Sequence, residues 1–181
     1  MHKLSQLESP RLVLVASTAA HVRTELEAPE QLGAMLGASV SSDWPSGEYD
    51  RDAMLFFLAR LEEGGPAVEG WYGWYALSKS ATIAERALVG GAGYFGPPDA
   101  DGTVEIGYSV LPQWQRQGVA SEVVAMLVAH AMTFATVARV IAHTAEGNLG
   151  SVKALLNNGF VAEGSGDDPG TLRFARSRLP A

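Results

Sequence analysis

One short segment of the chain has the residue types of an anion site. Residues 115–121 have the sequence QRQGVAS and lie between a β-branched run and a long stretch of helical periodicity. The first backbone N–H groups of a helix have no intrahelical partner, and the helix dipole adds positive potential at that end. Gly118 has no side chain, so a ligand can approach the backbone closely there. The segment therefore predicts a phosphate-binding turn, the alternative being an ordinary strand–helix connection.

The elements that position this turn are predicted from periodicity and from turn residues. A strand over 103–110 leads into it, and a helix over 118–137 leaves it with apolar residues three or four positions apart. Because a further strand follows the helix, we expect a parallel strand pair joined by a crossover helix. The later elements are a strand over 138–144, a short helix over 148–157 ended by Gly159, and strands near 160–162 and 171–175.

The first half of the chain has helices followed by a run of strands. Thr18 is suited to cap a helix that Pro29 interrupts and that resumes to about Leu36, and Ser46 is predicted to open a second helix. The fold class is therefore α+β, with a mostly antiparallel sheet, one parallel pair and flanking helices, in a single domain over 1–181. The strands expected here cover 11–16, 71–77 and 87–95.

Composition narrows the classes of function. The chain has 181 residues, 47% of them hydrophobic, a net charge of −7 and no cysteine. This acidity disfavours a nucleic-acid partner and favours cationic or amine substrates. The absence of cysteine excludes disulfides and thiolate chemistry. The polar N-terminus, residues 1–11, has no apolar signal core, and no apolar run is long enough for a membrane span, so we expect a cytoplasmic protein without a membrane partner.

Several motifs resemble those of the GNAT N-acetyltransferases, specifically the RimJ/RimL-like branch. The resemblance covers nearly the whole chain and is least specific before Thr103. It implies a GNAT fold, in which the sheet splays at its parallel strand pair. The matching segments are Pro10–Leu14, Glu105-Ile106-Gly107-Tyr108, Gln115-x-x-Gly118-x-Ala120, Gly118-Val119-Ala120-Ser121-Glu122, Asn148-Leu149-Gly150-Ser151 and Asn158–Gly164.

The resemblance implies acetyl-CoA as a cosubstrate. The thioester is then expected where strands 103–110 and 138–144 diverge, with Val110 and its neighbours pairing with the pantetheine arm as an added strand does. Asn148 would hydrogen-bond the same arm, although asparagine at that position is equally a plain helix cap. In the turn, Gln115 would shape the backbone, and the amides of Arg116, Gln117, Gly118, Val119, Ala120 and Ser121 would hold the pyrophosphate.

An N-acetyltransferase also needs groups that handle protons. Glu105 is the candidate base, sharing one strand face with Gly107 and Ser109, although without the motif context a solvated strand glutamate is the more ordinary interpretation. Many members of the superfamily have a tyrosine acid in the last helix, where this chain has Leu155. Ser151 is then the substitute acid, with helix capping as its alternative, and Tyr108 is a second candidate.

The departure at Leu155 also keeps open a second function, that of a catalytically silent acyl-CoA-binding or sensor module. For the acetyltransferase, the expected acceptor is a primary amine, either a protein N-terminus or a small molecule, and exposed sheet edges make a homodimer plausible.

We interpret the aromatic residues upstream mainly as core, with an acceptor pocket as the alternative. They are Trp44 in the segment Asp43-Trp44-Pro45, Tyr49, Trp71 and Trp74.

Two further patterns predict no chemistry. Residues 91–96 match G-x-G-x-x-G, but Pro97-Pro98 follows instead of a helix, so we interpret them as strand glycines and a turn. The four histidines lack metal-ligand spacing, so no metal site is expected, and His130 is predicted to pack on the apolar face of its helix. The other three are His2, His21 and His143.

Overall fold

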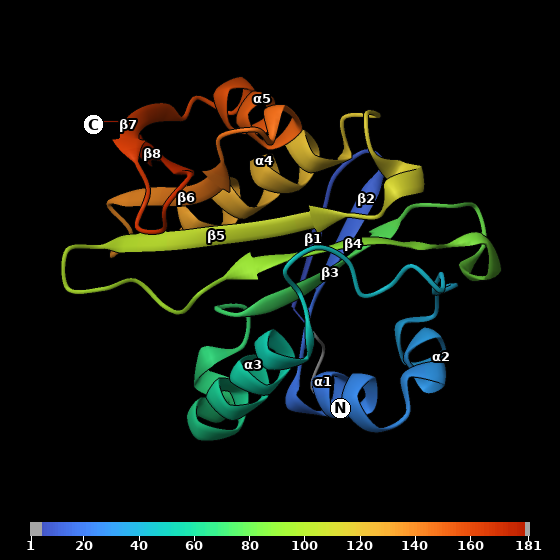
Figure 1. Cartoon of the computed structure of the whole chain (residues 1–181). Helices are drawn as coiled ribbons and strands as arrows, with labels where there is room; N and C mark the ends of the chain where they lie inside the picture. Colours follow the sequence, from blue (N-terminus) through green and yellow to red (C-terminus); the bar gives the residue numbers. More distant parts are fainter. Residues whose placement is uncertain (1–4, 180–181) are drawn as a thin grey trace.

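The computed structural model describes residues 5–179, which form one eight-stranded sheet with helices on both faces (Figure 1). The strand order is β1-β2-β3-β4-β5-β6-β8-β7, and β5 with β6 is the parallel pair among antiparallel neighbours. This confirms the predicted fold class. The strands are β1 (Gln6–Glu8), β2 (Leu12–Ala16), β3 (Gly73–Ser78), β4 (Leu88–Tyr94), β5 (Thr103–Val110), β6 (Arg139–Ala145), β7 (Val161–Ser165) and β8 (Thr171–Ser177).

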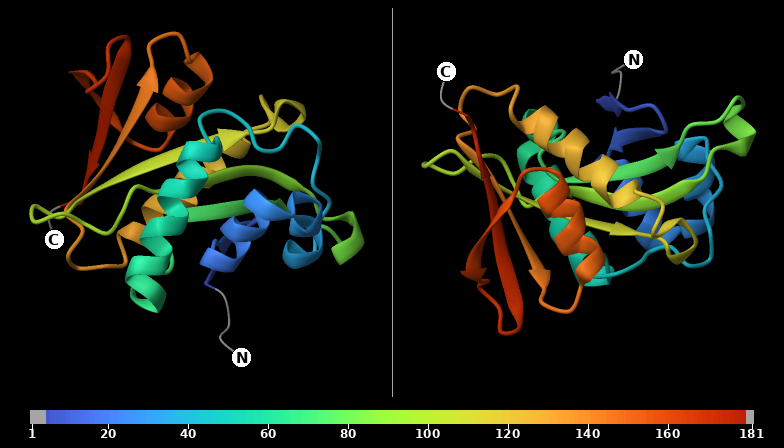
Figure 2. Two further views of the ribbon diagram at one scale, coloured as in Figure 1. Left: turned by 60° about the horizontal axis from the view of Figure 1, so that its bottom comes forward. Right: turned by 90° about the horizontal axis from the view of Figure 1, so that it is seen from above.

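The helices form two layers. One face of the sheet carries α1 (Ala19–Glu27), α2 (Leu32–Leu36) and α3 (Arg51–Gly64), and the other carries α4 (Val119–Ala131) and α5 (Leu149–Asn157) (Figures 1 and 2). Strand β2 is buried on both faces, because Leu12 and Leu14 pack in the core that includes α4, whereas Val13 packs in the core that includes α2. The sheet is therefore the middle layer, and its two faces can carry different sites.

Strands β5 and β6 separate part-way along their length. They pair over Thr103–Ile106 and Arg139–Ala142 only, after which the rest of β5 pairs with β4 and the rest of β6 pairs with β8. Figure 2 shows β6, β7 and β8 turning away from the remaining strands together with α5. The predicted divergence of this parallel pair is confirmed, and it leaves one edge of residues 107–110 without a strand partner among the described residues.

Helix boundaries differ from the sequence prediction at two places. Helix α3 begins at Arg51, not near Ser46, because Asp50 is the N-cap and its carboxylate accepts from the Ala53 amide at 3.0 Å. Helix α4 ends at Ala131, not near Val137, because Arg178 and the Thr133 hydroxyl donate hydrogen bonds to the backbone carbonyl oxygens there. Thr18 caps α1 as predicted. Strand β1 was not predicted.

No helix within residues 5–179 has the length and apolar character to cross a membrane.

Candidate active site

The turn before α4 has its backbone amides free. Gly118 is the N-cap in the left-handed conformation (φ 78°), and Arg116 also has positive φ (58°). Within the described part of the chain, none of the backbone amides of 116–121 donates a hydrogen bond. The Gln115 side chain donates to the Val110 carbonyl oxygen at 2.9 Å, which fixes the turn against the end of β5. The structure thus presents a cluster of free donors at a helix N-terminus, where the dipole favours an anion.

A cation that sequence reasoning did not identify lies beside this turn. The Arg11 guanidinium donates to the Gln117 carbonyl oxygen at 2.8 Å and to Glu122 at 2.7 Å, and a Cβ placed on Gly118 would lie 3.4 Å from it. Burial opposes the charge on Glu122, but hydrogen bonds from Ser9 and Arg11 outweigh it and lower the pKa of this carboxyl group. The link anchors the segment before β2 to the first turn of α4, and the only sequence signal for it was the Pro10–Leu14 motif.

Two of the candidate acids lie together at the divergence of β5 and β6. The Tyr108 hydroxyl lies 2.7 Å from the Ser151 Oγ, so a residue of β5 contacts the first turn of α5. Burial raises the pKa of Tyr108, and its hydrogen bond with Ser151 opposes that rise. Asn148 caps the same helix by accepting from the Ser151 amide at 3.1 Å. Leu155 is fully buried in the core, so it contributes no polar group here.

Glu105 lies apart from this pair, on the opposite face of β5. Its carboxylate is 2.8 Å from Nδ1 of His143, and it lines a small hollow of about 200 Å³. The predicted alternation is confirmed, because Val104 and Ile106 are buried in the α4 core. Phe95 lines both this hollow and the larger cavity described next, so the two are neighbours.

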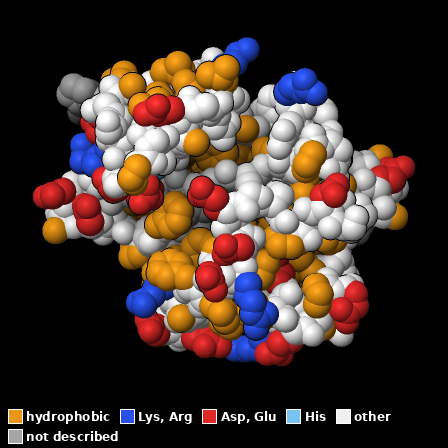
Figure 3. Space-filling view, in the orientation of Figure 1, with side chains coloured by type: hydrophobic (Ala, Val, Ile, Leu, Met, Phe, Trp, Pro, Cys, Tyr) orange, Lys and Arg blue, Asp and Glu red, His pale blue; other side chains and the backbone are white. Residues whose placement is uncertain are grey.

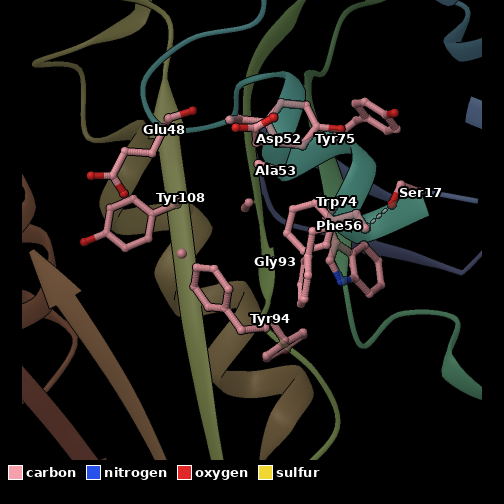
Figure 4. Close-up of a pocket in the computed structure, with 18 of the residues that line it drawn as sticks. Ser17, Glu48, Asp52, Ala53, Phe56, Trp74, Tyr75, Gly93, Tyr94 and Tyr108 are labelled. Atoms are coloured by element: carbon pink, nitrogen blue, oxygen red, sulfur yellow. Dashed lines mark hydrogen bonds between the residues drawn. The ribbon is translucent and has the colours of Figure 1, made fainter. Parts of the chain in front are cut away.

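The larger cavity, of about 470 Å³, lies between α3 and strands β3, β4 and β5. Figure 4 shows Glu48 and Tyr108 at one side of it and Phe56 and Trp74 at the other. Figure 3 shows hydrophobic and acidic side chains gathered on this face of the molecule. The aromatic residues that line the cavity are Trp44, Tyr49, Phe56, Phe57, Trp74, Tyr75, Tyr94, Phe95 and Tyr108.

Glycines of β4 and β5 make room for these rings. A Cβ on Gly91 would lie 2.9 Å from the Trp44 ring, and a Cβ on Gly107 would lie 3.0 Å from the Phe95 ring. Gly91 and its neighbours thus belong to a strand and the turn after it, as predicted for the G-x-G-x-x-G match. Their role is steric, because aromatic side chains pack directly on the backbone that the missing Cβ atoms leave exposed.

A buried carboxylate holds three of the cavity walls in place. Glu25 of α1 is only 6% exposed and accepts from the Trp44 indole at 2.8 Å, the Tyr49 hydroxyl at 2.7 Å and the Tyr75 hydroxyl at 2.6 Å. Burial raises the pKa of Glu25, and the three hydrogen bonds oppose that rise. Sequence reasoning missed this residue. Its one signal was an acidic residue beside Val22 and Leu26 in the same helix.

The aromatic residues singled out from the sequence thus divide into two groups. Trp71 is core, as predicted, and packs against Tyr94 and Phe134. Trp74 is also core, and Trp44 and Tyr49 pack against core clusters, but all three side chains line the cavity as well, which was the alternative interpretation. Asp43 is not among the lining residues.

The histidines behave as packing or hydrogen-bonding residues where they are described. His130 contacts the Tyr94 hydroxyl at 3.0 Å, and burial lowers its pKa. His21 closes a capping box with Thr18. Over residues 5–179 no group of three or more histidine, aspartate or glutamate side chains could hold a metal ion, and His2 lies outside the described residues.

Known proteins match the chain over most of its length. The family model of the acetyltransferase (GNAT) domain matches residues 11–161. The uncharacterised N-acetyltransferase YjdG of Bacillus subtilis is 29% identical over 126 residues, which cover 70% of this chain and 71% of that protein. A putative GNAT-family acetyltransferase from Bordetella pertussis has a TM-score of 0.65 at 21% identity, covering 96% of this chain and 99% of its own. RimL, a ribosomal L7/L12 alpha-N-protein acetyltransferase solved with coenzyme A, has a TM-score of 0.64 at 19% identity, covering 96% and 98%.

Proposed function

The chain belongs to the GNAT acetyltransferase family and is an acetyl-CoA-dependent acetyltransferase, and from that premise we propose that it acetylates a primary amine by direct attack on the thioester. The observation that carries the proposal is the arrangement of two features around the end of β5. Free backbone amides lie at the N-terminus of α4, and the Tyr108–Ser151 hydroxyl pair lies where β5 and β6 diverge. The first feature suits a pyrophosphate, and the second suits a leaving thiolate.

We assign the backbone amides of 116–121 to the pyrophosphate of the cofactor. In support, these donors have no internal partner, Gly118 leaves space in front of them, and Arg11, whose charge is paired with Glu122, holds the turn through the Gln117 carbonyl oxygen. Gln115 shapes the turn through its hydrogen bond to Val110. The side chains of Gln117, Val119, Ala120 and Ser121 are not required for this role, because the backbone supplies the donors.

The pantetheine arm is assigned to the free edge of β5. Its amide groups match the spacing of an added strand, so Val110 and its neighbours can pair with it as β6 pairs with the first half of β5. Asn148 lies at the start of α5, across the divergence, and contacts the arm from that side. The thioester then lies beside Tyr108, at the entrance to the aromatic cavity.

The proton balance of the reaction assigns the remaining roles. A primary ammonium loses one proton before attack, its nitrogen then bonds to the thioester carbon, and the carbon–sulfur bond breaks as the nitrogen loses a second proton. The departing thiolate takes a proton from Tyr108, whose raised pKa keeps it protonated and whose contact with Ser151 orients it. Glu105, with His143, is assigned to accept the proton that the ammonium loses before attack, and because Glu105 lies in the neighbouring hollow, that proton reaches it through water. The second proton lost by the nitrogen restores the Tyr108 hydroxyl.

Two measurements test this function. Isothermal titration with acetyl-CoA measures binding, and thiol release with a chromogenic reagent measures transfer across a panel of primary amines. Binding with amine-dependent thiol release is the expected result. Absence of binding at millimolar acetyl-CoA would refute the cofactor assignment, and binding without release for any amine would refute the transfer.

A further inference from the structure

We propose that the acceptor is a small primary amine carried on an aromatic body, with the ring held in the aromatic cavity and the ammonium held by Glu48 and Asp52. This inference rests on the proposed function, because it names the substrate class of that reaction. Its three supports are the size and lining of the cavity, the two acidic residues that also line it, and the position of Tyr108 in its wall.

The cavity has the size and surface of a small-molecule site. Its volume of about 470 Å³ lies within the range of ligand pockets, roughly 300–1,000 Å³. Trp74, Tyr75 and Tyr94 are almost completely buried, so the deep part of the cavity is rigid and apolar. Burying an aromatic ring in the cavity is favourable, because its lining is largely apolar and the exposed rings of Phe56 and Phe95 can make stacked and edge-to-face contacts with it.

Two carboxylates complete the chemistry. Glu48 and Asp52 are exposed, and neither has a hydrogen bond or an ion pair with any described residue. Many of the molecule's other acidic side chains are already paired: Glu62 with Arg23, Glu63 with Arg60 and Glu122 with Arg11 are examples. An unpaired carboxylate beside aromatic faces attracts a cation, and the rings add to the attraction.

The arrangement sets the orientation of the substrate. In Figure 4 the Glu48 side chain lies on the same side of the cavity as Tyr108, and Phe56 and Trp74 lie on the other. An ammonium near Glu48 is therefore near the proposed reaction centre, while the ring extends toward Phe56 and Trp74. A polyamine would place further charges against these apolar walls, which costs desolvation energy without a partner. A peptide N-terminus would bring polar backbone groups into the same space.

The test compares three acceptors with the wild-type protein. Thiol release is measured with 2-phenylethylamine, with spermidine and with a short peptide that has a free N-terminal serine. We expect kcat/KM for 2-phenylethylamine to exceed the other two by about tenfold or more, a factor that about 1.4 kcal/mol produces. A higher kcat/KM for spermidine or the peptide would overturn the substrate class and leave acetyl transfer intact. Titration of 2-phenylethylamine in the presence of coenzyme A measures amine binding separately from turnover. Binding without turnover would mean that acetyl transfer fails although the amine is recognised. Absence of binding would overturn the proposed substrate class.

The charged part of the site is tested with a matched pair of ligands. 2-Phenylethanol has the same ring without the ammonium and is measured as a competitive inhibitor. In Glu48→Gln/Asp52→Asn we expect 2-phenylethylamine to bind about tenfold more weakly, while binding of 2-phenylethanol and of acetyl-CoA is unchanged. Glu30→Gln, at an exposed position outside the cavity, is the matched control and should alter none of these. Equal weakening of both ring ligands, or no weakening of the amine, would overturn the role of the two carboxylates.

Discussion

The two halves of the active site are built in different ways. At the cofactor end, consecutive residues 115–121 present backbone donors, and most side chains there point elsewhere or stabilise the turn. At the acceptor end, the cavity is lined by side chains from α3, from the loop before it and from strands β3, β4 and β5. The cofactor end needs a local backbone conformation. The acceptor end needs the whole fold, together with a buried carboxylate that anchors three of its walls.

This difference predicts how each half responds to substitution. A site made of backbone amides tolerates changes of side chain but not a group that blocks the amides or repels phosphate. A site made of side chains loses affinity gradually, one wall or one charge at a time. The predictions below start with the cofactor end and proceed toward smaller effects.

Gly118→Asp should abolish acetyl-CoA binding. The new side chain adds a negative charge in front of the free amides of the turn, where the phosphates are expected. We expect isothermal titration to detect no binding at millimolar acetyl-CoA. The control is Gly170→Asp, because Gly170 has almost the same backbone conformation (φ 76° against 78°) and open space around it. Equal affinity of Gly118→Asp and the wild type would refute the turn assignment.

Tyr108→Phe should lower kcat by about 100-fold, the usual contribution of a general acid. KM for acetyl-CoA should not change, because the pyrophosphate turn is untouched. Since burial raises the pKa of Tyr108 above 10.0, its acid form persists as pH rises, and the wild-type kcat should show no loss from tyrosinate formation below that pH. Steady-state thiol release over a range of pH measures both. A kcat for Tyr108→Phe close to the wild-type value would exclude Tyr108 as the acid.

Glu25→Ala should raise KM for the amine by about tenfold, because the Trp44, Tyr49 and Tyr75 walls lose their shared acceptor. KM for acetyl-CoA should be unchanged, since the two ends are built independently. Glu25→Gln is the matched variant. Its amide oxygen still accepts, and a tyrosine hydroxyl can turn to accept from the new NH₂ group, so its amine KM should remain close to wild type. Parallel shifts in both KM values for Glu25→Ala would contradict the separation of the two ends.

The titration of Glu25 should also make the thermal stability of the protein depend on pH. Burial raises its pKa above 4.5 in the folded state, so the folded protein binds more protons than the unfolded one, and its contribution to stability is lost as pH rises through the folded value. Glu25→Gln removes this titration. Relative to the wild type, its Tm should therefore rise with increasing pH above 4.5. Thermal unfolding of both proteins at several pH values measures the difference between their Tm values. A difference that does not change with pH would refute the titration of Glu25.

The same contrast explains what the sequence could predict. The turn at 115–121, strand β5 and the caps Thr18 and Asn148 were predictable, because each depends on a few consecutive residues. Glu25 and its three partners were not, since Trp44, Tyr49 and Tyr75 reach it from segments separated by up to 50 positions in the chain. The same holds for the hydrogen bond from Arg11 to the Gln117 carbonyl oxygen, which joins residues 106 positions apart. Helix ends also escaped prediction where a distant group, such as Arg178 at the end of α4, takes up the backbone carbonyls.

The separation of the two ends can be measured directly by amide NMR. A ¹⁵N-labelled sample is titrated first with coenzyme A and then with 2-phenylethylamine, and the perturbed backbone and indole signals are assigned. We predict that coenzyme A shifts the amides of 116–121 most strongly, and that the amine shifts residues of the cavity, including the Trp44 indole that donates to Glu25. Strong coenzyme A shifts around Trp44 together with unchanged amides at 116–121 would contradict this account of the active site.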